Sequence, residues 1–391
     1  MNKRTEGVDI IAGIPSLNEA DNIAFVTQQL ASGLSTYFPD LSAMIINVDN
    51  NSMDGTREAF LNVDTGKVVK KYISTDTTVV GKDNNMRNLF LEVVQQRAKA
   101  AIVVDADLKS ITPEWVKILV SPILEGNDYI TPLYSRNEYD GTITNHITYP
   151  LIYSLFKANI RQPIGGDFSF SPLMATKWLD MEWEESTRQY GIDIFMTTSA
   201  LLNGFKVGQV VLGSKVHKPS APKLGPMFSQ VVSTLFSNIS KFQETWINGK
   251  ARKDCQVFGQ VCYKEPQGLS IDYKELKKKG IDGFLKEEKM LTSILPLPHY
   301  TIVKKMHATG RWNISSQLWT KILYDFIHAY EISEDRDAVI EALKPVYFAR
   351  AASFYRQTLD MTHQESEAKI VSQARQFHKG KGYLVNRFQL K

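Results

Sequence analysis

The stretch Ala100-Ala101-Ile102-Val103-Val104-Asp105-Ala106-Asp107 decides the fold class. Five consecutive small or branched apolar residues predict a strand buried on both faces, as in parallel sheets covered by helices. Alternate residues of an extended backbone point the same way, so Asp105 and Asp107 can bind one hard cation such as Mg²⁺ or Mn²⁺. An Asp-x-Asp pair is weak by itself, because a strand end often carries a solvated aspartate or a helix cap.

Outward from this strand, short apolar runs alternate with helical patterns through the first two hundred residues. Expected strands cover 8–14 (ended by Pro15), 43–48, 68–73, 100–104 and 205–212; expected helices cover 20–37, 86–94 and a segment that begins near Thr56. This alternation predicts an α/β domain with a mainly parallel sheet. Beyond the proline-rich connector 218–226, amphipathic patterns at 228–239, 318–330 and 338–359 predict helices. We therefore expect one domain over 1–220 and a mainly helical domain over 221–391.

The composition is that of a globular protein with a sizeable core: 43% of the 391 residues are hydrophobic and 23% are charged. The formal net charge is only +4 and no basic stripe stands out, which argues against a nucleic-acid partner. Cys255 and Cys262 do not have zinc-site spacing. No run approaches the ~20 apolar residues of a membrane span, and the start lacks a secretory apolar segment, so we expect a cytoplasmic protein without a membrane span.

Polar residues follow several expected strands, where ligands of parallel sheets bind. Asn18 and Glu19 follow the first strand, 49–54 follows the second, and Asp105 with Asp107 follows the fourth. His217 follows the strand at 205–212 and is the candidate third metal ligand, although a plain surface-loop histidine fits the same position.

Three further segments combine glycine with charge. Lys82 opens a helix and suits an anionic group, although a solvated helix start is an equal reading, and the segment is no Walker loop. Gly165-Gly166-Asp167 lets the backbone approach a ligand, or forms a simple turn. Asp193 in Gly191-Ile192-Asp193 caps a helix or binds a sugar or acceptor hydroxyl.

Taken in order, these segments resemble the glucosyl-3-phosphoglycerate synthases and the mannosylglycerate synthases. The resemblance covers roughly 8–220 and rests on 15–19, 49–56, 81–82, 105–108, 141–144, 162–167, 190–193 and His217. It implies a retaining glycosyltransferase with a GT-A fold, a Rossmann-like nucleotide-sugar domain with a mainly parallel sheet, followed by a helical C-terminal part.

The resemblance also implies roles for individual residues. The nucleotide-sugar would contact Pro15, Leu17, Asn18, Glu19, Asp49, Ser52, Lys82, Asp105, Ala106 and Gly166. Asp105, Asp107 and His217 would hold Mg²⁺ or Mn²⁺. Lys82, Asp167 and Asp193 would be catalytic, with Lys82 close to the nucleotide and the two aspartates facing the transferred sugar and its acceptor. Arg136, Gly141, Thr142, Thr144 and Asp193 would bind the acceptor.

The chain departs from the family at two positions. The phosphoglycerate enzymes carry Gly-Arg-Val-Thr where this chain has Gly141-Thr142-Ile143-Thr144, and threonine cannot pair bidentately with phosphate as arginine does. This predicts D-glycerate or a similar small hydroxy acid as the acceptor. Asp167 stands where the family usually has Glu, so the transferred sugar can be glucose or mannose. The nucleotide of the donor, UDP or GDP, is also open.

The sequence thus predicts a metal-dependent hexosyltransferase that makes a glycosylglycerate-type compatible solute, with a homodimer through the helical part as a further expectation. Alternatives are a glucosyl-3-phosphoglycerate synthase, a GT-A transferase with a different acceptor, a nucleotidyltransferase, and a non-catalytic sugar-nucleotide-binding module. Release of free nucleoside diphosphate, sensitive to EDTA, separates a transferase from the last two.

Overall fold

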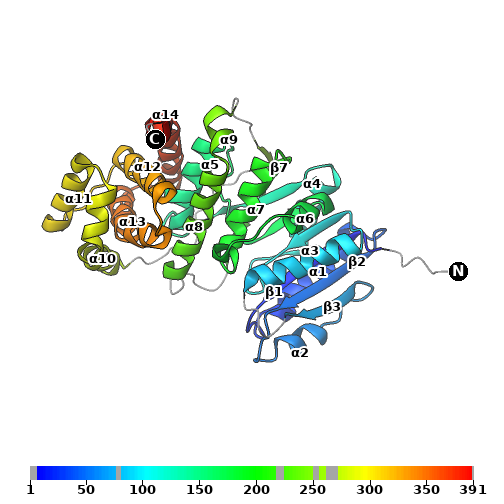
Figure 1. The fold of residues 1–391 in the computed structure, drawn as a ribbon. Helices are drawn as coiled ribbons and strands as arrows, with labels where there is room; N and C mark the ends of the chain where they lie inside the picture. The colour runs from blue at the N-terminus through cyan, green and yellow to red at the C-terminus, as the bar shows by residue number, and fades with distance from the viewer. Residues whose placement is uncertain (1–6, 76–80, 217–223, 250–254, 261–271, 390–391) are drawn as a thin grey trace. The chain divides into compact units, whose positions relative to one another are not determined.

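The computed structural model describes residues 7–75, 81–216, 224–249, 255–260 and 272–389 (Figure 1). The chain forms two compact units, and each is discontinuous in sequence. The first unit comprises 1–135, 162–224 and 255–264, and the second comprises 136–161, 225–254 and 265–391. The sequence predicts a single boundary at residue 220. In the structure, the segment 136–161 lies before that boundary but belongs to the second unit, and the strand at 256–258 lies after it but belongs to the first.

The first unit is built on one eight-stranded sheet with the order β3-β2-β1-β4-β6-β5-β7-β8. Its elements are β1 (Ile10–Ser16), α1 (Ile23–Tyr37), β2 (Ala43–Asp49), α2 (Thr56–Leu61), β3 (Val69–Ser74), α3 (Lys82–Gln95), β4 (Ala100–Val103), α4 (Pro113–Leu124), β5 (Tyr129–Ser135), β6 (Phe168–Phe170), α6 (Pro172–Leu179), η2 (Glu185–Thr187), α7 (Gly191–Leu202), β7 (Val207–Ser214) and β8 (Gln256–Phe258). Among the strands of the described residues, β6 alone runs antiparallel to its neighbours, so the predicted mainly parallel sheet is confirmed.

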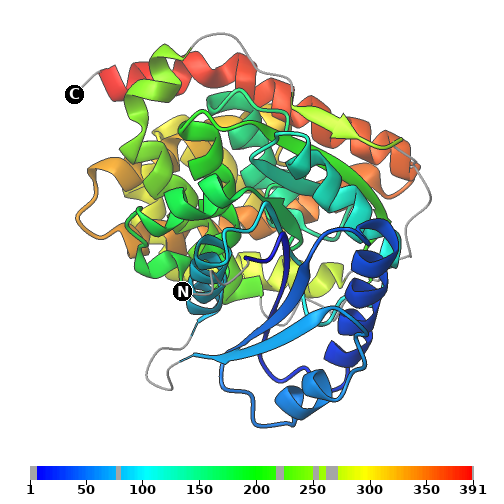
Figure 2. The same cartoon turned by 90° about the vertical axis from the view of Figure 1, so that its right-hand side faces the viewer.

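Helices cover both faces of this sheet. Successive side chains of β1 point to opposite faces, so this strand packs against both layers of helices. Ile10, Ala12 and Ile14 join one buried cluster with residues of α1 and α4. Figure 2 shows α1, the large dark-blue helix, beside the blue strands. On the other face, Phe90 of α3 stacks on Trp178 of α6, with ring centroids 4.8 Å apart. These two layers hold the strand ends in fixed places.

At Gly13 the side chain of Leu89 on α3 packs directly against the backbone of β1. A Cβ at this position would lie 2.3 Å from Leu89 Cδ2. We expect Gly13→Ala to destabilise the first unit by about 1–3 kcal/mol through overpacking. Denaturant unfolding measures this, and Leu89→Ala combined with Gly13→Ala should cost less than the sum of the two single changes. Strict additivity would contradict this account of the contact.

The second unit is helical, as the sequence predicts. It contains η1 (Thr144–Thr148), α5 (Tyr149–Leu155), nearly all of α8 (Leu224–Lys241), α9 (Gln243–Asn248), α10 (Tyr273–Ile294), α11 (Leu297–Thr309), α12 (Ser316–Ile332), α13 (Arg336–Thr358) and α14 (His363–Gln389). Buried polar contacts fix the packing: Trp319 Nε1 donates to the His146 carbonyl and Tyr324 Oη donates to the Phe377 carbonyl.

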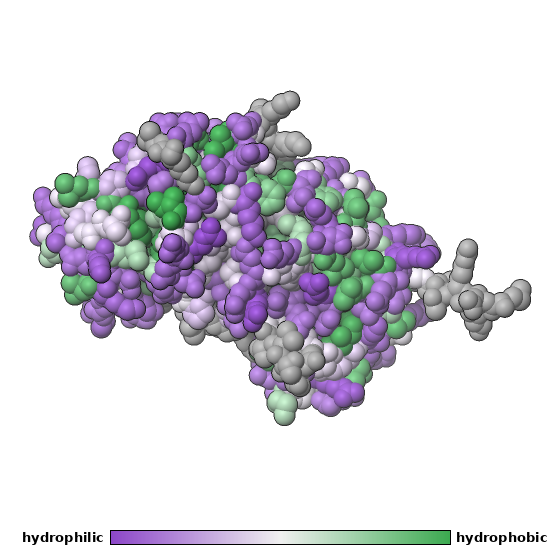
Figure 3. All heavy atoms as spheres, in the orientation of Figure 1, coloured by the Kyte–Doolittle hydropathy of each residue, from purple (hydrophilic) through white to green (hydrophobic). Residues whose placement is uncertain are grey.

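Polar residues dominate the face drawn in Figure 3, and apolar ones are scattered among them. Among the described residues, no helix has the length and apolar character that crossing a membrane requires.

Candidate active site

The loops after β1 and β2 are tied together by backbone-to-side-chain hydrogen bonds. The Asn18 N–H donates to Ser52 Oγ at 2.7 Å, and the Glu19 N–H donates to Thr56 Oγ1 at 2.9 Å. Asn18 has a positive φ of 55°, which asparagine tolerates better than most residues. The predicted nucleotide-binding residues Pro15, Leu17, Asn18, Glu19 and Ser52 therefore lie near one another, and Leu17 is half exposed.

Asp49 lies beneath these loops and is fully buried. Its carboxylate accepts hydrogen bonds from Ser16 Oγ at 2.7 Å, Ser52 Oγ at 2.6 Å and Tyr72 Oη at 2.8 Å. Burial and the hydrogen bond to Asp49 raise the pKa of Tyr72 to about 12. Asp49 therefore joins the ends of β1, β2 and β3, and a direct contact with the nucleotide stays a prediction.

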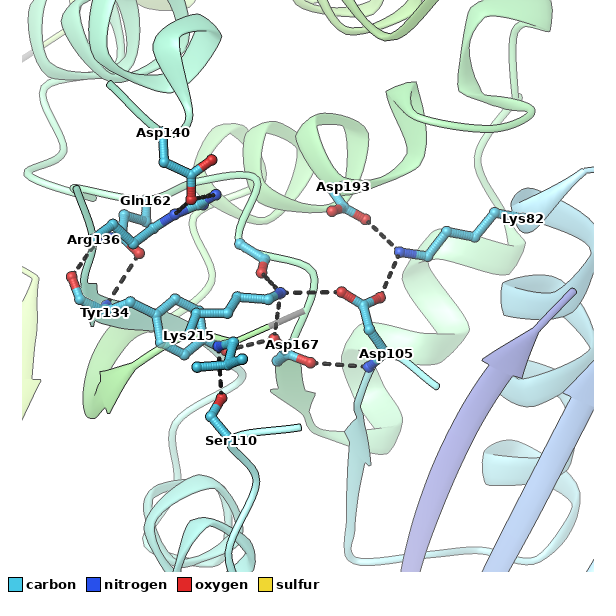
Figure 4. Close-up of polar contacts among 12 residues, drawn as sticks. Lys82, Asp105, Ser110, Tyr134, Arg136, Asp140, Gln162, Asp167, Asp193 and Lys215 are labelled. Atoms are coloured by element: carbon cyan, nitrogen blue, oxygen red, sulfur yellow. Dashed lines mark hydrogen bonds and ion pairs between the residues drawn. The ribbon is translucent and has the colours of Figure 1, made fainter. Parts of the chain in front are cut away.

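Lys82 reaches the centre of the site because α3 begins close to the segment before α7. The Asp83 N–H donates to the Arg188 carbonyl at 3.0 Å, and a Cβ on Gly81 would lie 2.5 Å from the same oxygen. The Lys82 ammonium then lies 3.3 Å from Asp105 Oδ1 and 3.5 Å from Asp193 Oδ1. Three predicted site residues from distant parts of the chain are thus neighbours (Figure 4).

Lys215, which follows β7, is a site residue that the sequence analysis missed. Its ammonium donates to Asp167 Oδ2 at 2.8 Å, to Asp105 Oδ2 at 3.1 Å and to the Gly165 carbonyl at 2.7 Å (Figure 4). Its side chain is only 5% exposed, so these carboxylates are its main source of compensation for lost hydration. A lysine directly after a strand whose carboxyl end meets the site was the available signal.

Asp167 is the buried support of this cluster. It has no exposed surface, and its Oδ1 accepts the Asp105 N–H at 2.9 Å while its Oδ2 accepts from Lys215 and from Tyr134 Oη. With both oxygens engaged, Asp167 positions Asp105 in this structure. The predicted direct action of Asp167 on the transferred sugar stays a prediction.

The charges of the cluster are strongly interdependent. Burial alone would raise the pKa of Asp105, but Lys82 and Lys215 hold it well below its usual range. Burial likewise opposes the charge on Lys82, yet Asp105 and Asp193 raise the pKa of its ammonium. Burial raises the pKa of Asp193, and Lys82 partly offsets this. Asp105 is therefore the securely ionised carboxylate of the group.

Two adjacent glycines allow this packing. Gly166 has a φ of +87°, and a Cβ there would lie 2.3 Å from Asp105 Oδ2. A Cβ on Gly165 would lie 2.1 Å from Pro132 Cγ. The glycine pair is thus more than a simple turn, because any side chain would displace the carboxylate of Asp105 or Pro132 in the middle of β5.

The surroundings of Asp105 and Asp107 fit a divalent cation in part. Ala106 is buried, whereas both aspartates are partly exposed, as the alternation predicts. Val216 is held beside the loop that follows them, since its N–H donates to Ser110 Oγ at 3.0 Å and its carbonyl accepts the Lys109 N–H at 2.8 Å. His217 comes next in the chain but lies outside the described residues. Among the described residues alone, no group of three His, Cys, Asp or Glu side chains could hold a metal ion.

The predicted acceptor residues Arg136, Gly141, Thr142 and Thr144 lie in the second unit. Arg136 forms an ion pair with Asp140, with Nη2 2.7 Å from Oδ2. Thr142 Oγ1 shares a hydrogen bond with Tyr347 Oη, and Thr144 is buried at the start of η1. Four predicted residues thus occupy one short segment, while their contact with an acceptor stays a prediction.

Comparisons with known proteins find similarity to glycosyltransferases. Residues 12–179 match the model of glycosyl transferase family 2. Over 251 residues the chain is 26% identical to glucosyl-3-phosphoglycerate synthase of Mycolicibacterium paratuberculosis, covering 59% of this chain and 72% of that protein.

Solved structures of glucosyl-3-phosphoglycerate synthase from Mycobacterium tuberculosis are also similar. One, in complex with Mg²⁺ and uridine diphosphate, is 24% identical with a TM-score of 0.48, over 59% of this chain and 79% of that one. Another, with Mn²⁺, UDP-glucose and phosphoglyceric acid, is 22% identical with a TM-score of 0.47, over 59% and 80%.

The match over residues 12–179 and the mixed, mainly parallel sheet identify a domain that resembles the glycosyltransferases and has a GT-A-like fold. Within that class, the chain resembles the glucosyl-3-phosphoglycerate synthases, as its motifs predict.

Proposed function

We propose that this chain is a retaining, metal-dependent glycosyltransferase that moves a hexose from a nucleoside diphosphate sugar to D-glycerate or a similar small hydroxy acid. The observation that carries the proposal is the cluster of Lys82, Asp105, Asp193 and Lys215 at the carboxyl edge of the sheet. Two cations beside an ionised aspartate suit a diphosphate leaving group better than they suit a neutral sugar.

Two of the three proposed ligands, Asp105 and Asp107, supply the hard carboxylate oxygens that suit Mg²⁺ or Mn²⁺. Asp105 and Asp107 would hold this cation, and His217 would complete the protein ligands. When bound, such a cation neutralises charge that grows on the departing diphosphate. Lys82 would donate to a phosphate oxygen of the same group. Its raised pKa keeps it cationic at neutral pH.

Asp193 is the carboxylate best placed to orient a sugar or acceptor hydroxyl. It is partly exposed and Lys82 is its neighbour at 3.5 Å. Retention without a covalent intermediate implies attack on the same face from which the diphosphate leaves, with the acceptor proton passing to the leaving phosphate oxygen. In that reaction the protein mainly holds two substrates in a reactive arrangement.

Turnover assays test the proposal directly. UDP-glucose, GDP-glucose, UDP-mannose and GDP-mannose are each incubated with D-glycerate or 3-phosphoglycerate, with Mg²⁺ or Mn²⁺, and release of nucleoside diphosphate is followed. We expect EDTA-sensitive release with D-glycerate and formation of an α-glycoside detected by NMR. A strong preference for 3-phosphoglycerate would replace the proposed acceptor with the phosphorylated acid, and release of pyrophosphate would contradict glycosyl transfer.

A further inference from the structure

The three N–H donors of the Lys215 ammonium have acceptors within the protein itself. Lys215 Nζ lies 2.7 Å from the Gly165 carbonyl, 2.8 Å from Asp167 Oδ2 and 3.1 Å from Asp105 Oδ2. With its donors committed in this way, Lys215 acts on the side chain of Asp105 rather than as a donor to a substrate. The position of Asp105 therefore depends on the groups that hold Lys215.

Asp167 holds Asp105 at two points. Its Oδ1 accepts the Asp105 N–H at 2.9 Å, and its Oδ2 accepts from Lys215, whose ammonium also donates to Asp105. The terminal torsion of an aspartate side chain is broad, so the orientation of the Asp167 carboxylate depends on its hydrogen-bond donors. A group that fixes Asp167 therefore also fixes the backbone and the side chain of Asp105.

Tyr134 on β5 contacts both members of the Asp167–Lys215 ion pair (Figure 4). Its Oη donates to Asp167 Oδ2, and the Lys215 ammonium lies 5.3 Å from the centroid of its ring. The side chain is buried, so water does not replace its hydroxyl as a donor to Asp167. All of these residues belong to the first unit.

The backbone of Tyr134 is held on both sides of its peptide plane. Its N–H donates to Gln162 Oε1 at 3.1 Å, and its carbonyl accepts from Gln162 Nε2 at 2.8 Å (Figure 4). The register of β5 against β7 also shifts here: Leu133 pairs with Val211, whereas Tyr134 pairs with Gly213. Such a bulge re-aims the side chains beside it and is common next to active sites. Tyr134 is thus placed by a local departure from regular pairing.

We propose that Tyr134 is a positioning residue for glycosyl transfer: its hydroxyl fixes the Asp167 carboxylate, and Asp167 in turn holds Asp105 in place. This inference rests on the proposed function, in which Asp105 acts at the departing diphosphate. Without the hydroxyl the Asp167 carboxylate turns and Asp105 shifts, and misplacing a group by about 1 Å costs on the order of a hundredfold in rate. The loops proposed to bind the nucleoside follow β1 and β2, so the loss falls on kcat rather than on KM.

Tyr134→Phe removes only the hydroxyl, and Tyr129→Phe is its matched control. Tyr129 lies on the same strand, is fully buried, and shares a hydrogen bond of 3.2 Å with the uncharged Thr197 Oγ1. Kinetics use the fastest of the nucleotide sugars named above with the acid that the wild-type enzyme turns over. We expect kcat to fall about ten- to a hundredfold in Tyr134→Phe, with KM for the nucleotide sugar within about twofold of the wild type. Tyr129→Phe should change neither constant by more than about twofold.

A second variant, Gln162→Met, removes both hydrogen bonds to the Tyr134 backbone and keeps the hydroxyl. It should also lower kcat at unchanged KM, and it decides the question if circular dichroism shows that Tyr134→Phe does not fold. An unchanged kcat, a rise in KM at unchanged kcat, or an equal loss of kcat in Tyr129→Phe overturns the inference and leaves the proposed function standing. Absence of turnover by the wild-type enzyme with every donor and acceptor overturns the proposed function and the inference with it.

Discussion

Replacing Asp107 by Ala should reduce glycosyl transfer by about a thousandfold or more while the fold stays intact. The expected size follows from the several kcal/mol that a bound cation contributes to stabilising leaving-group charge, because each ~1.4 kcal/mol is a factor of ten in rate. Asp107 is partly exposed at the carboxyl edge of the sheet, so its loss should cost little stability. Release of nucleoside diphosphate, titrated with Mn²⁺, measures the effect, and circular dichroism checks the fold.

The matched control for this variant is Asp64→Ala. Asp64 is an exposed aspartate of the same unit that accepts the Gly66 N–H in a loop, so the change in net charge is the same. It should retain full turnover. The metal assignment fails if Asp107→Ala is as active as Asp64→Ala, or if EDTA has no effect on the wild-type enzyme.

The sequence predicts which polar residues meet at the carboxyl edge of the sheet, because their positions are local to strand ends. The order of apolar runs places β1, β2 and β4 in a parallel sheet, and their carboxyl ends then meet. That rule alone brings Asn18 and Asp105 to one edge. The glycine pair at 165–166 was also readable, since adjacent glycines indicate a close approach of backbone to another group.

What the sequence did not predict comes from long-range pairing. β6 is only three residues long and antiparallel, and β5 is separated from its partner β7 by more than 70 residues. No periodicity in so short a strand distinguishes it from a loop. Without β5 and β7 side by side, Tyr134 and Lys215 could not be placed against Asp167.

The sequence also does not predict that 136–161 belongs to the second unit. Residues 136–161 carry a helical pattern in the middle of an α/β sequence, and they pack with α14 through the ion pair of Arg161 with Glu367. A contact between residues 206 positions apart in the sequence produces no local sequence pattern. A boundary inferred from composition alone therefore fell at the proline-rich connector.

Replacing Lys215 by Met should unfold the first unit more easily and also abolish turnover. Lys215 is the closest cation to the fully buried Asp167, at 2.8 Å, and its own side chain is 5% exposed. Removing one partner of such a pair leaves a buried charge without compensation, which costs about 3–5 kcal/mol. Lys99→Met, which breaks an exposed pair with Asp9 at 2.8 Å, is the matched control and should cost less than about 1 kcal/mol.

A second substitution separates stability from activity. Adding Asp167→Asn to Lys215→Met removes the stranded charge, so chemical denaturation followed by circular dichroism should show that more than half of the lost stability returns. Turnover should stay lost, because Asp105 still lacks the ammonium that holds its Oδ2 at 3.1 Å. Equal instability of the single and double variants would mean that Lys215 stabilises the fold by packing alone. Activity restored by the double variant would show that the ammonium is dispensable for the reaction.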